Sequence, residues 1–169
     1  MTTEQLRHRM PPILKALKER SLRGRTPVEG LRRTECAYHG WDTVHADAAS
    51  WEPFAPGDAF GGLEAHHCFK GTVTLPEASA GKRVVCLVST GASDIWNNNN
   101  PQFLAYVDGR LVCGLDVNHN EFDLAACAVP GESHELALYV YCNTPARDVF
   151  LRVETAERDD DVTGLYYDL

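Results

Sequence analysis

The sequence lacks any apolar run long enough to cross a membrane, and its first six residues lack the hydrophobic stretch of a secretory signal. No asparagine stands in the Asn-x-Ser/Thr pattern that N-glycosylation requires. These absences predict a cytoplasmic protein with no membrane partner.

Basic charge is also scarce, with 16 Lys and Arg residues against 24 Asp and Glu and a net charge of −8. Nucleic acids and anionic membranes bind basic surfaces, so neither is an expected partner. Nine of these 16 basic residues lie before residue 34. This clustering favours a solvated helix face that docks on an acidic surface over the alternative of an RNA-binding arm.

Cysteine pairs with metal-binding spacing are missing as well. The six cysteines include no Cys-x-x-Cys, which argues against a structural zinc site built from cysteine. Cys86 and Cys142 stand in apolar runs that suit small buried side chains. We therefore expect all six cysteines to be reduced thiols.

What is present is a strong hairpin signal after residue 100. Apolar residues alternate over 103–107, and Asp108-Gly109 follows at once. Asp-Gly between two alternating runs predicts a tight turn, because such a turn needs positive φ. The return strand, 111–115, leads into the polar run 116–121. The hairpin thus carries a polar cluster to one end of a sheet.

Short apolar runs between Gly and Pro turns continue through most of the chain. They predict strands at Thr34–Tyr38, His67–Leu75, Arg83–Ser89, Phe103–Val107, Leu111–Leu115, Phe122–Ala125, Glu135–Cys142 and Val149–Glu154. Many strands without intervening helices predict a mainly β fold, an antiparallel β-sandwich of the jelly-roll type.

An N-terminal helix is expected before the sandwich, kinked or restarted at Pro11-Pro12. Gly24, Pro27 and Gly30 then predict a linker. The expected organisation is a helical segment and linker at 1–30, the sandwich at 31–160 and a connecting link at 161–169.

Several motifs carry a family resemblance. They are the hairpin block Pro101–Phe122, Trp51-Glu52-Pro53-Phe54, Phe60-Gly61-Gly62, His66-His67-Cys68-Phe69, Leu75-Pro76-Glu77, Gly81-Lys82-Arg83-Val84 and Leu165-Tyr166-Tyr167-Asp168-Leu169. Together they resemble the N-terminal region of family 38 glycoside hydrolases, the class II α-mannosidases of the cytosolic and bacterial type. Cys68 and Phe60 stand where that family usually has tryptophan.

The resemblance implies a galactose-binding-like sandwich that supports a downstream catalytic domain and contributes to subunit contacts. In the family, the zinc-binding His-x-Asp motif, the nucleophilic aspartate and the acid carboxylate all lie beyond this region. The parent enzyme would hydrolyse terminal α-mannosides with zinc. This chain alone is expected to be non-catalytic, without a cofactor, and to have the catalytic domain of the same enzyme as its partner.

Two segments stand out as carbohydrate-binding or domain-docking candidates. Their residues are Trp96, Asn97, Asn98, Asn100, Asp116, Asn118, His119 and Glu121. The polar run 116–121 leaves the hairpin with few expected partners in its own sheet, so its side chains should be solvated or paired across an interface. Trp41, Trp51 and Trp96 are further candidates for stacking on sugar rings.

The same residues leave other interpretations open. One is an autonomous module that binds mannose-containing glycans, and another is a homo-oligomerisation domain. A metal site is not expected: His66 and His67 should point to opposite faces of a strand, and His45-x-Asp47 lacks partner ligands.

Overall fold

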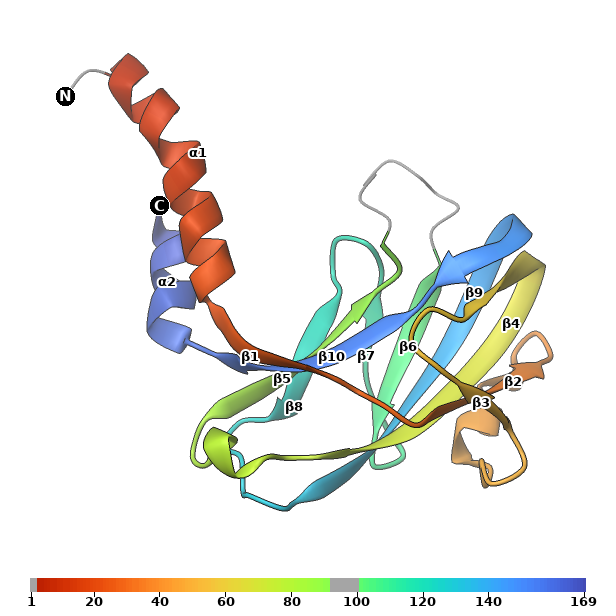
Figure 1. Cartoon of the computed structure of the whole chain (residues 1–169). Helices are drawn as coiled ribbons and strands as arrows, with labels where there is room; N and C mark the ends of the chain where they lie inside the picture. Colours follow the sequence, from red (N-terminus) through yellow and green to blue (C-terminus); the bar gives the residue numbers. More distant parts are fainter. Residues whose placement is uncertain (1–2, 92–100) are drawn as a thin grey trace.

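The computed structural model of the chain describes residues 3–91 and 101–169, with the side chains of 3–6 and 144–148 excepted. Two antiparallel sheets pack against each other, and a pair of helices projects from one end of them (Figure 1). The expected antiparallel β-sandwich with an N-terminal helix is therefore confirmed.

The strand order of each sheet is as follows. The four-stranded sheet has the order β1 (Leu22–Pro27), β10 (Arg152–Arg158), β5 (Arg83–Ser89) and β8 (Glu121–Ala125). The six-stranded sheet has the order β3 (Glu52–Phe54), β2 (Leu31–Cys36), β4 (Ala59–Thr74), β9 (Ser133–Phe150), β6 (Gln102–Val107) and β7 (Arg110–Leu115). The remaining elements are the helices α1 (Thr3–Arg20) and α2 (Asp160–Asp168) and the short 3-10 helices η1 (Gly40–His45) and η2 (Glu77–Ser79).

The main core lies between the sheets and depends on the long antiparallel pair β4–β9. Phe69 lies opposite Leu138 in this pair, and both side chains are fully buried. Val88 of β5 and Val153 of β10 face the same core from the other sheet. Burial of each such side chain contributes about 1.5–3 kcal/mol, so the pairing register is fixed by which residues face inward.

The hairpin expected at Asp108-Gly109 is present between β6 and β7. Both residues have positive φ, 50° for Asp108 and 73° for Gly109, as a tight two-residue turn requires. The Asp108 carboxylate also accepts a hydrogen bond from the backbone N–H of Glu135 at 2.9 Å. The turn is therefore tied to the neighbouring strand β9.

The linker interpretation of residues 21–30 is wrong for Leu22–Pro27, which form strand β1 at the edge of the four-stranded sheet. β1 pairs antiparallel with β10, and the pairing register shifts between Arg23 and Thr26, where Gly24 has φ 60°. Nearly all of its side chains are exposed, so the strand shows no apolar alternation in the sequence. It is held by backbone pairing, and Pro27 is tolerated because β1 has a free edge.

A second apolar cluster lies on the outer face of the six-stranded sheet, under the segment 37–51, which we call the cover segment. Its buried members are Val44, Trp51, Cys68, Tyr106, Ala137 and Tyr139. Basic side chains tie the cover segment to the sheet: Arg32 donates to the carbonyls of Ala49 (3.1 Å) and Trp51 (2.9 Å), and Lys70 donates to that of Ala46 (2.9 Å).

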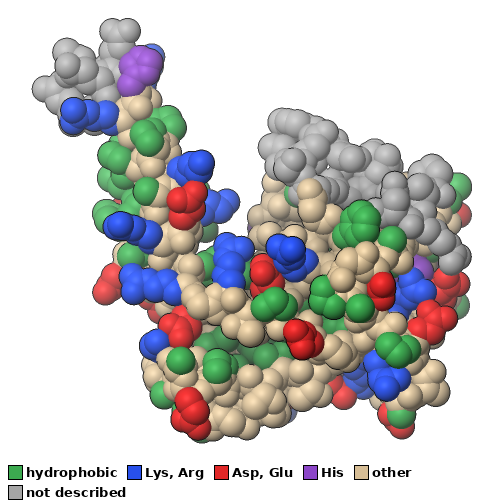
Figure 2. Space-filling model, viewed as in Figure 1, with side chains coloured by type: hydrophobic (Ala, Val, Ile, Leu, Met, Phe, Trp, Pro, Cys, Tyr) green, Lys and Arg blue, Asp and Glu red, His purple; other side chains and the backbone are tan. Residues whose placement is uncertain are grey.

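Helices α1 and α2 pack against each other beyond the sandwich (Figure 1). α1 runs through Pro11 and Pro12, which lack the N–H groups that would complete its ladder. Lys and Arg side chains, with some acidic ones, lie among hydrophobic side chains along this projecting arm (Figure 2). Within the described residues no helix has both the length and the apolar character needed to span a bilayer.

Candidate functional site

The polar run at the end of the hairpin forms a closed turn that crosses from one sheet to the other. Asp116 follows the last residue of β7 and Glu121 begins β8. The Asp116 carboxylate accepts hydrogen bonds from the backbone N–H groups of Asn118 and His119, both at 2.7 Å. The Asp116 N–H in turn donates to the His119 carbonyl at 3.0 Å. These hydrogen bonds, above all that from the His119 N–H, lower the pKa of Asp116 below its usual range.

The expectation that this run has few partners in its own sheet is therefore wrong for Glu121, whereas Asp116 has its partners within the turn itself. Asp116 caps its own turn, and Glu121 pairs with Arg158 of β10. Asn118 and His119 are exposed at the tip of the turn. The remaining candidates, Trp96, Asn97, Asn98 and Asn100, lie outside the described residues.

Asp116 also lies at the rim of a shallow hollow on the outer face of the six-stranded sheet. The hollow has a volume of about 350 Å³ and is lined by Gln102, Phe103, Leu104, Gly114, Leu115, Asp116, Tyr139 and Tyr141. Its lining combines an amide, a carboxylate and two phenol rings. A volume of this size lies at the low end of the range of small-ligand pockets.

Beside the hollow, six rings form one continuous group, which we call the aromatic surface. Its members are Tyr38, His39, Trp41, His66, Tyr139 and Tyr141. Tyr38 and Trp41 are 71% and 41% exposed, whereas Tyr139 and His66 lie beneath them. His39 has φ 59°, a left-handed conformation that is uncommon outside glycine, and it places its ring between those of Tyr38 and Trp41.

His66 anchors the base of the aromatic surface. Its Nδ1 lies 2.8 Å from the Tyr139 hydroxyl. Burial, and then the nearby charge of His39, lowers the pKa of His66. The His66 ring is therefore neutral at physiological pH and serves as a hydrogen-bonded structural group.

The expected opposite orientation of the two adjacent histidines is confirmed. His66 faces the aromatic surface, whereas His67 faces the core, where its Nε2 lies 3.2 Å from the Gly61 carbonyl. His45 contacts the ring of Tyr106, while the Asp47 carboxylate accepts from the Ala49 N–H at 2.9 Å. Among the residues that the structure describes, no three His, Cys, Asp or Glu side chains are grouped as metal ligands.

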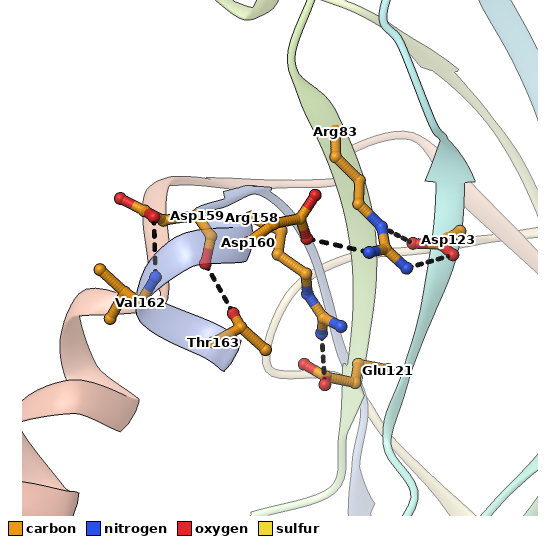
Figure 3. Close-up of polar contacts among 8 residues, drawn as sticks. All are labelled: Arg83, Glu121, Asp123, Arg158, Asp159, Asp160, Val162 and Thr163. Carbon is orange, nitrogen blue, oxygen red and sulfur yellow. Dashed lines mark hydrogen bonds and ion pairs between the residues drawn. The ribbon is translucent and has the colours of Figure 1, made fainter. Parts of the chain in front are cut away.

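A set of ion pairs fixes the junction between the sandwich and α2 (Figure 3). Arg83 makes two hydrogen bonds of 2.7 Å to Asp123 and one of 2.9 Å to Asp160, the first residue of α2. Hydrogen bonding to Asp123 raises the pKa of Arg83, and the same contact lowers the pKa of Asp123. Arg158 pairs with Glu121 beside them.

Asp159 caps the helix at this junction. Its carboxylate accepts from the Val162 N–H at 3.0 Å, and its carbonyl accepts from the Thr163 hydroxyl at 2.7 Å (Figure 3). The same carboxylate also accepts from Arg23 of β1 at 2.8 Å. A capped helix that is also paired with two strands has a defined direction. The junction therefore determines where the chain leaves the sandwich.

Of the aromatic surface, the sequence identified only Trp41 as a ligand-stacking candidate. Trp51 instead belongs to the buried cluster under the cover segment. The tyrosines were missed because the rings come from three distant segments, residues 38–41, β4 and β9, which only the β2–β4 and β4–β9 registers bring together.

No protein-family model and no curated protein sequence matches this chain. Solved structures do match. The β-glucuronidase of Faecalibacterium prausnitzii is 13% identical with a TM-score of 0.51, over 80% of this chain and 32% of that one. The β-glucuronidase of an uncultured Clostridium sp. is 8% identical, with a TM-score of 0.54 over 80% and 29%. That of Ruminococcus gnavus is 8% identical, with a TM-score of 0.56 over 79% and 28%.

This chain thus spans less than a third of the length of each of these glycoside hydrolases. At such low identity the likeness shows a common fold. The chain has the β-sandwich fold that forms part of these enzymes.

Proposed function

We propose that this chain is a non-catalytic accessory domain of a glycoside hydrolase, and that the parent enzyme is a family 38 α-mannosidase. The assignment to a glycoside hydrolase domain rests on the fold. The structural match covers four-fifths of this chain but under a third of each β-glucuronidase. The assignment to family 38 is supported by the resemblance of the hairpin block and of Leu165–Leu169 to that family. The cytoplasmic location belongs to the same proposal.

In this proposal the zinc of the parent belongs to the catalytic domain, and the residues described here supply no ligand to it. Their contribution is mechanical. The sandwich holds the catalytic domain in place through a surface, and the junction at α2 sets the direction of the connecting chain.

The surface that we assign to docking is the aromatic surface together with the hollow at its side. Interfaces between domains bury aromatic side chains at their centre and polar groups at their rim. Tyr38 and Trp41 supply the exposed rings, and Gln102 and Asp116 supply polar atoms at the edge. Asp116 thus remains a docking candidate through its position, although its carboxylate is already engaged in the turn.

The reading frame that contains this chain tests the parentage. We expect a catalytic domain with a zinc-binding His-x-Asp motif beyond Leu169. A β-glucuronidase-type catalytic domain there would overturn the family 38 assignment and leave the accessory role intact. A reading frame without any catalytic domain would overturn both.

The docking role is tested in the full-length parent with the double variant Tyr38→Ala/Trp41→Ala. We expect the thermal unfolding of the two domains to separate and α-mannosidase activity to fall, because the exposed rings no longer bury their area at the interface. Val129→Ala is the matched control, since Val129 is also exposed (58%) but lies outside the aromatic surface. Equal behaviour of the double variant and the control would refute the docking surface.

Glycan binding is a second candidate function, favoured by the phenol rings, the amide and the carboxylate of the hollow. Calorimetric titration of this chain with an α-mannobioside distinguishes the two. Saturable binding that is lost in Tyr141→Ala would support a carbohydrate-binding module, whereas no heat at millimolar ligand leaves docking as the use of this surface.

A further inference from the structure

Two thiols lie in contact beneath the cover segment. The Sγ atoms of Cys36 and Cys68 are 3.6 Å apart. Cys36 is the last residue of β2 and Cys68 lies in the middle of β4. In the register of these strands Cys36 lies opposite His66, so Cys68 is its diagonal neighbour on the same face of the sheet.

The two thiols have unequal surroundings. Cys68 is fully buried, whereas Cys36 is only partly buried. The hydrogen bond with Cys68 lowers the pKa of Cys36. The same hydrogen bond and burial raise the pKa of Cys68. Cys36 is therefore the more acidic of the two thiols, and the thiolate is the reactive form of cysteine.

We propose that Cys36 and Cys68 form a redox-active pair, in which a hydroperoxide oxidises Cys36 and Cys68 then closes a reversible disulfide. Partial exposure, a lowered thiol pKa and a second thiol in contact are the features of oxidation-sensitive cysteines. This inference does not depend on the proposed function.

The oxidation takes place in two steps. The Cys36 thiolate attacks one oxygen of hydrogen peroxide, the O–O bond breaks, hydroxide leaves and Cys36 becomes a sulfenic acid. The Cys68 sulfur then attacks the Cys36 sulfur; the S–S bond forms, the S–O bond breaks, and water leaves with the Cys68 proton. The two sulfurs lose two electrons to the peroxide in all.

Closure requires the sulfurs to approach from 3.6 Å to about 2.05 Å. Diagonal neighbours are farther apart than directly opposed residues, so the bond pulls on the backbone. Only the end of β2 has to move, since Cys36 is its last residue and the chain then enters the cover segment. A bond closed against such resistance is more easily reduced than a structural disulfide, which makes the oxidation reversible.

The test is peroxide titration of the folded protein, followed by alkylation of the remaining thiols, digestion and mass spectrometry. We expect a Cys36–Cys68 cross-linked peptide that disappears on treatment with dithiothreitol. Cys127 is the internal control, because its thiol is exposed and contacts no other thiol among the residues that the structure describes. It should be alkylated or trapped as a sulfenic acid without an intramolecular link.

Two variants make the assignment specific. In Cys68→Ser the link is lost and dimedone should label Cys36, because the sulfenic acid has no thiol to resolve it. In Cys36→Ser we expect Cys68 to stay reduced at peroxide concentrations that modify Cys127. Far-UV circular dichroism checks that both variants fold.

Full alkylation of both Cys36 and Cys68 after Cys127 has been oxidised would overturn the proposal. A Cys36–Cys68 link that forms only in denaturant would overturn it equally, since the folded geometry would then play no part.

Discussion

The outer faces of the two sheets differ in kind. The outer face of the six-stranded sheet carries rings and thiols and is covered by the segment 37–51. The outer face of the four-stranded sheet carries charge, with Arg83 paired to Asp123 and Arg158 paired to Glu121 around a small apolar cluster. The outer face of the six-stranded sheet thus gains stability from apolar burial and exposes aromatic rings. The outer face of the four-stranded sheet holds helix α2 in place through ion pairs.

The physical difference between these faces is their dependence on water and salt. Buried apolar area stabilises at about 25 cal/mol per Å² and is little affected by salt. Exposed ion pairs are worth about 0–1 kcal/mol each and weaken as salt rises. Substitutions on the aromatic side should therefore affect folding, and those on the charged side should chiefly affect the placement of α2.

The largest expected effect is that of Trp51→Ala. Trp51 is 9% exposed and packs in the cluster under the cover segment. Loss of a buried aromatic side chain costs about 3–5 kcal/mol, partly through the cavity that it leaves. Urea unfolding measures the change, and Trp41→Ala is the matched control, because Trp41 is 41% exposed and should cost far less. Equal losses in the two variants would mean that the cover segment is not a packed layer.

On the charged face we expect a smaller loss from Arg83→Ala, about 1 kcal/mol, since the paired side chains are partly exposed. The variant also frees Asp160, so α2 should fray at its start, which amide hydrogen exchange at the helix detects. The matched control is Arg25→Ala, whose pairing with Glu154 at 3.7 Å is longer and not bidentate.

The pH dependence sharpens this second prediction. The hydrogen bond from Arg83 lowers the pKa of Asp123 below its ordinary value of 3.8. A lowered carboxyl pKa contributes stability above the ordinary value, and that contribution is lost as the pH falls through the folded-state pKa. The difference between wild type and Arg83→Ala should therefore shrink below about pH 4. A difference that is unchanged at pH 3 would mean that the Arg83 stem, not its charge, is responsible.

Much of the fold was predictable from the sequence, because strands that face a core show apolar alternation or continuous apolar runs. β5 has its expected bounds, Arg83–Ser89. The Asp108-Gly109 dipeptide predicts the hairpin turn, and both residues have the positive φ that such a turn needs. β1 was not predictable in this way, since an exposed edge strand pairs through its backbone and shows no apolar alternation.

The candidate site was less predictable, for two reasons that particular residues illustrate. Asp116 and Glu121 are close in sequence, but the turn between them takes them to different sheets. Conversely, Tyr38, His66 and Tyr139 are far apart in sequence and meet only through strand register and a left-handed backbone at His39. Local patterns reveal which residues alternate, whereas a surface assembled across strands depends on register.

The smallest expected effect concerns the turn that joins the two faces. Asp116→Ala removes the acceptor for two backbone N–H groups, which we expect to cost about 1 kcal/mol at neutral pH because the turn is partly solvated. His119→Ala is the control and should change little, as its exposed ring only reaches the Asp116 carboxylate at 3.3 Å. Because backbone hydrogen bonds hold the pKa of Asp116 below 3.8, the cost of Asp116→Ala should decline as the pH falls through the folded-state pKa of Asp116. Thermal unfolding at pH 7 and pH 3 measures both variants. If His119→Ala proved as costly as Asp116→Ala, the side-chain contact and not the backbone hydrogen bonds of the turn would be what stabilises the crossing between the sheets.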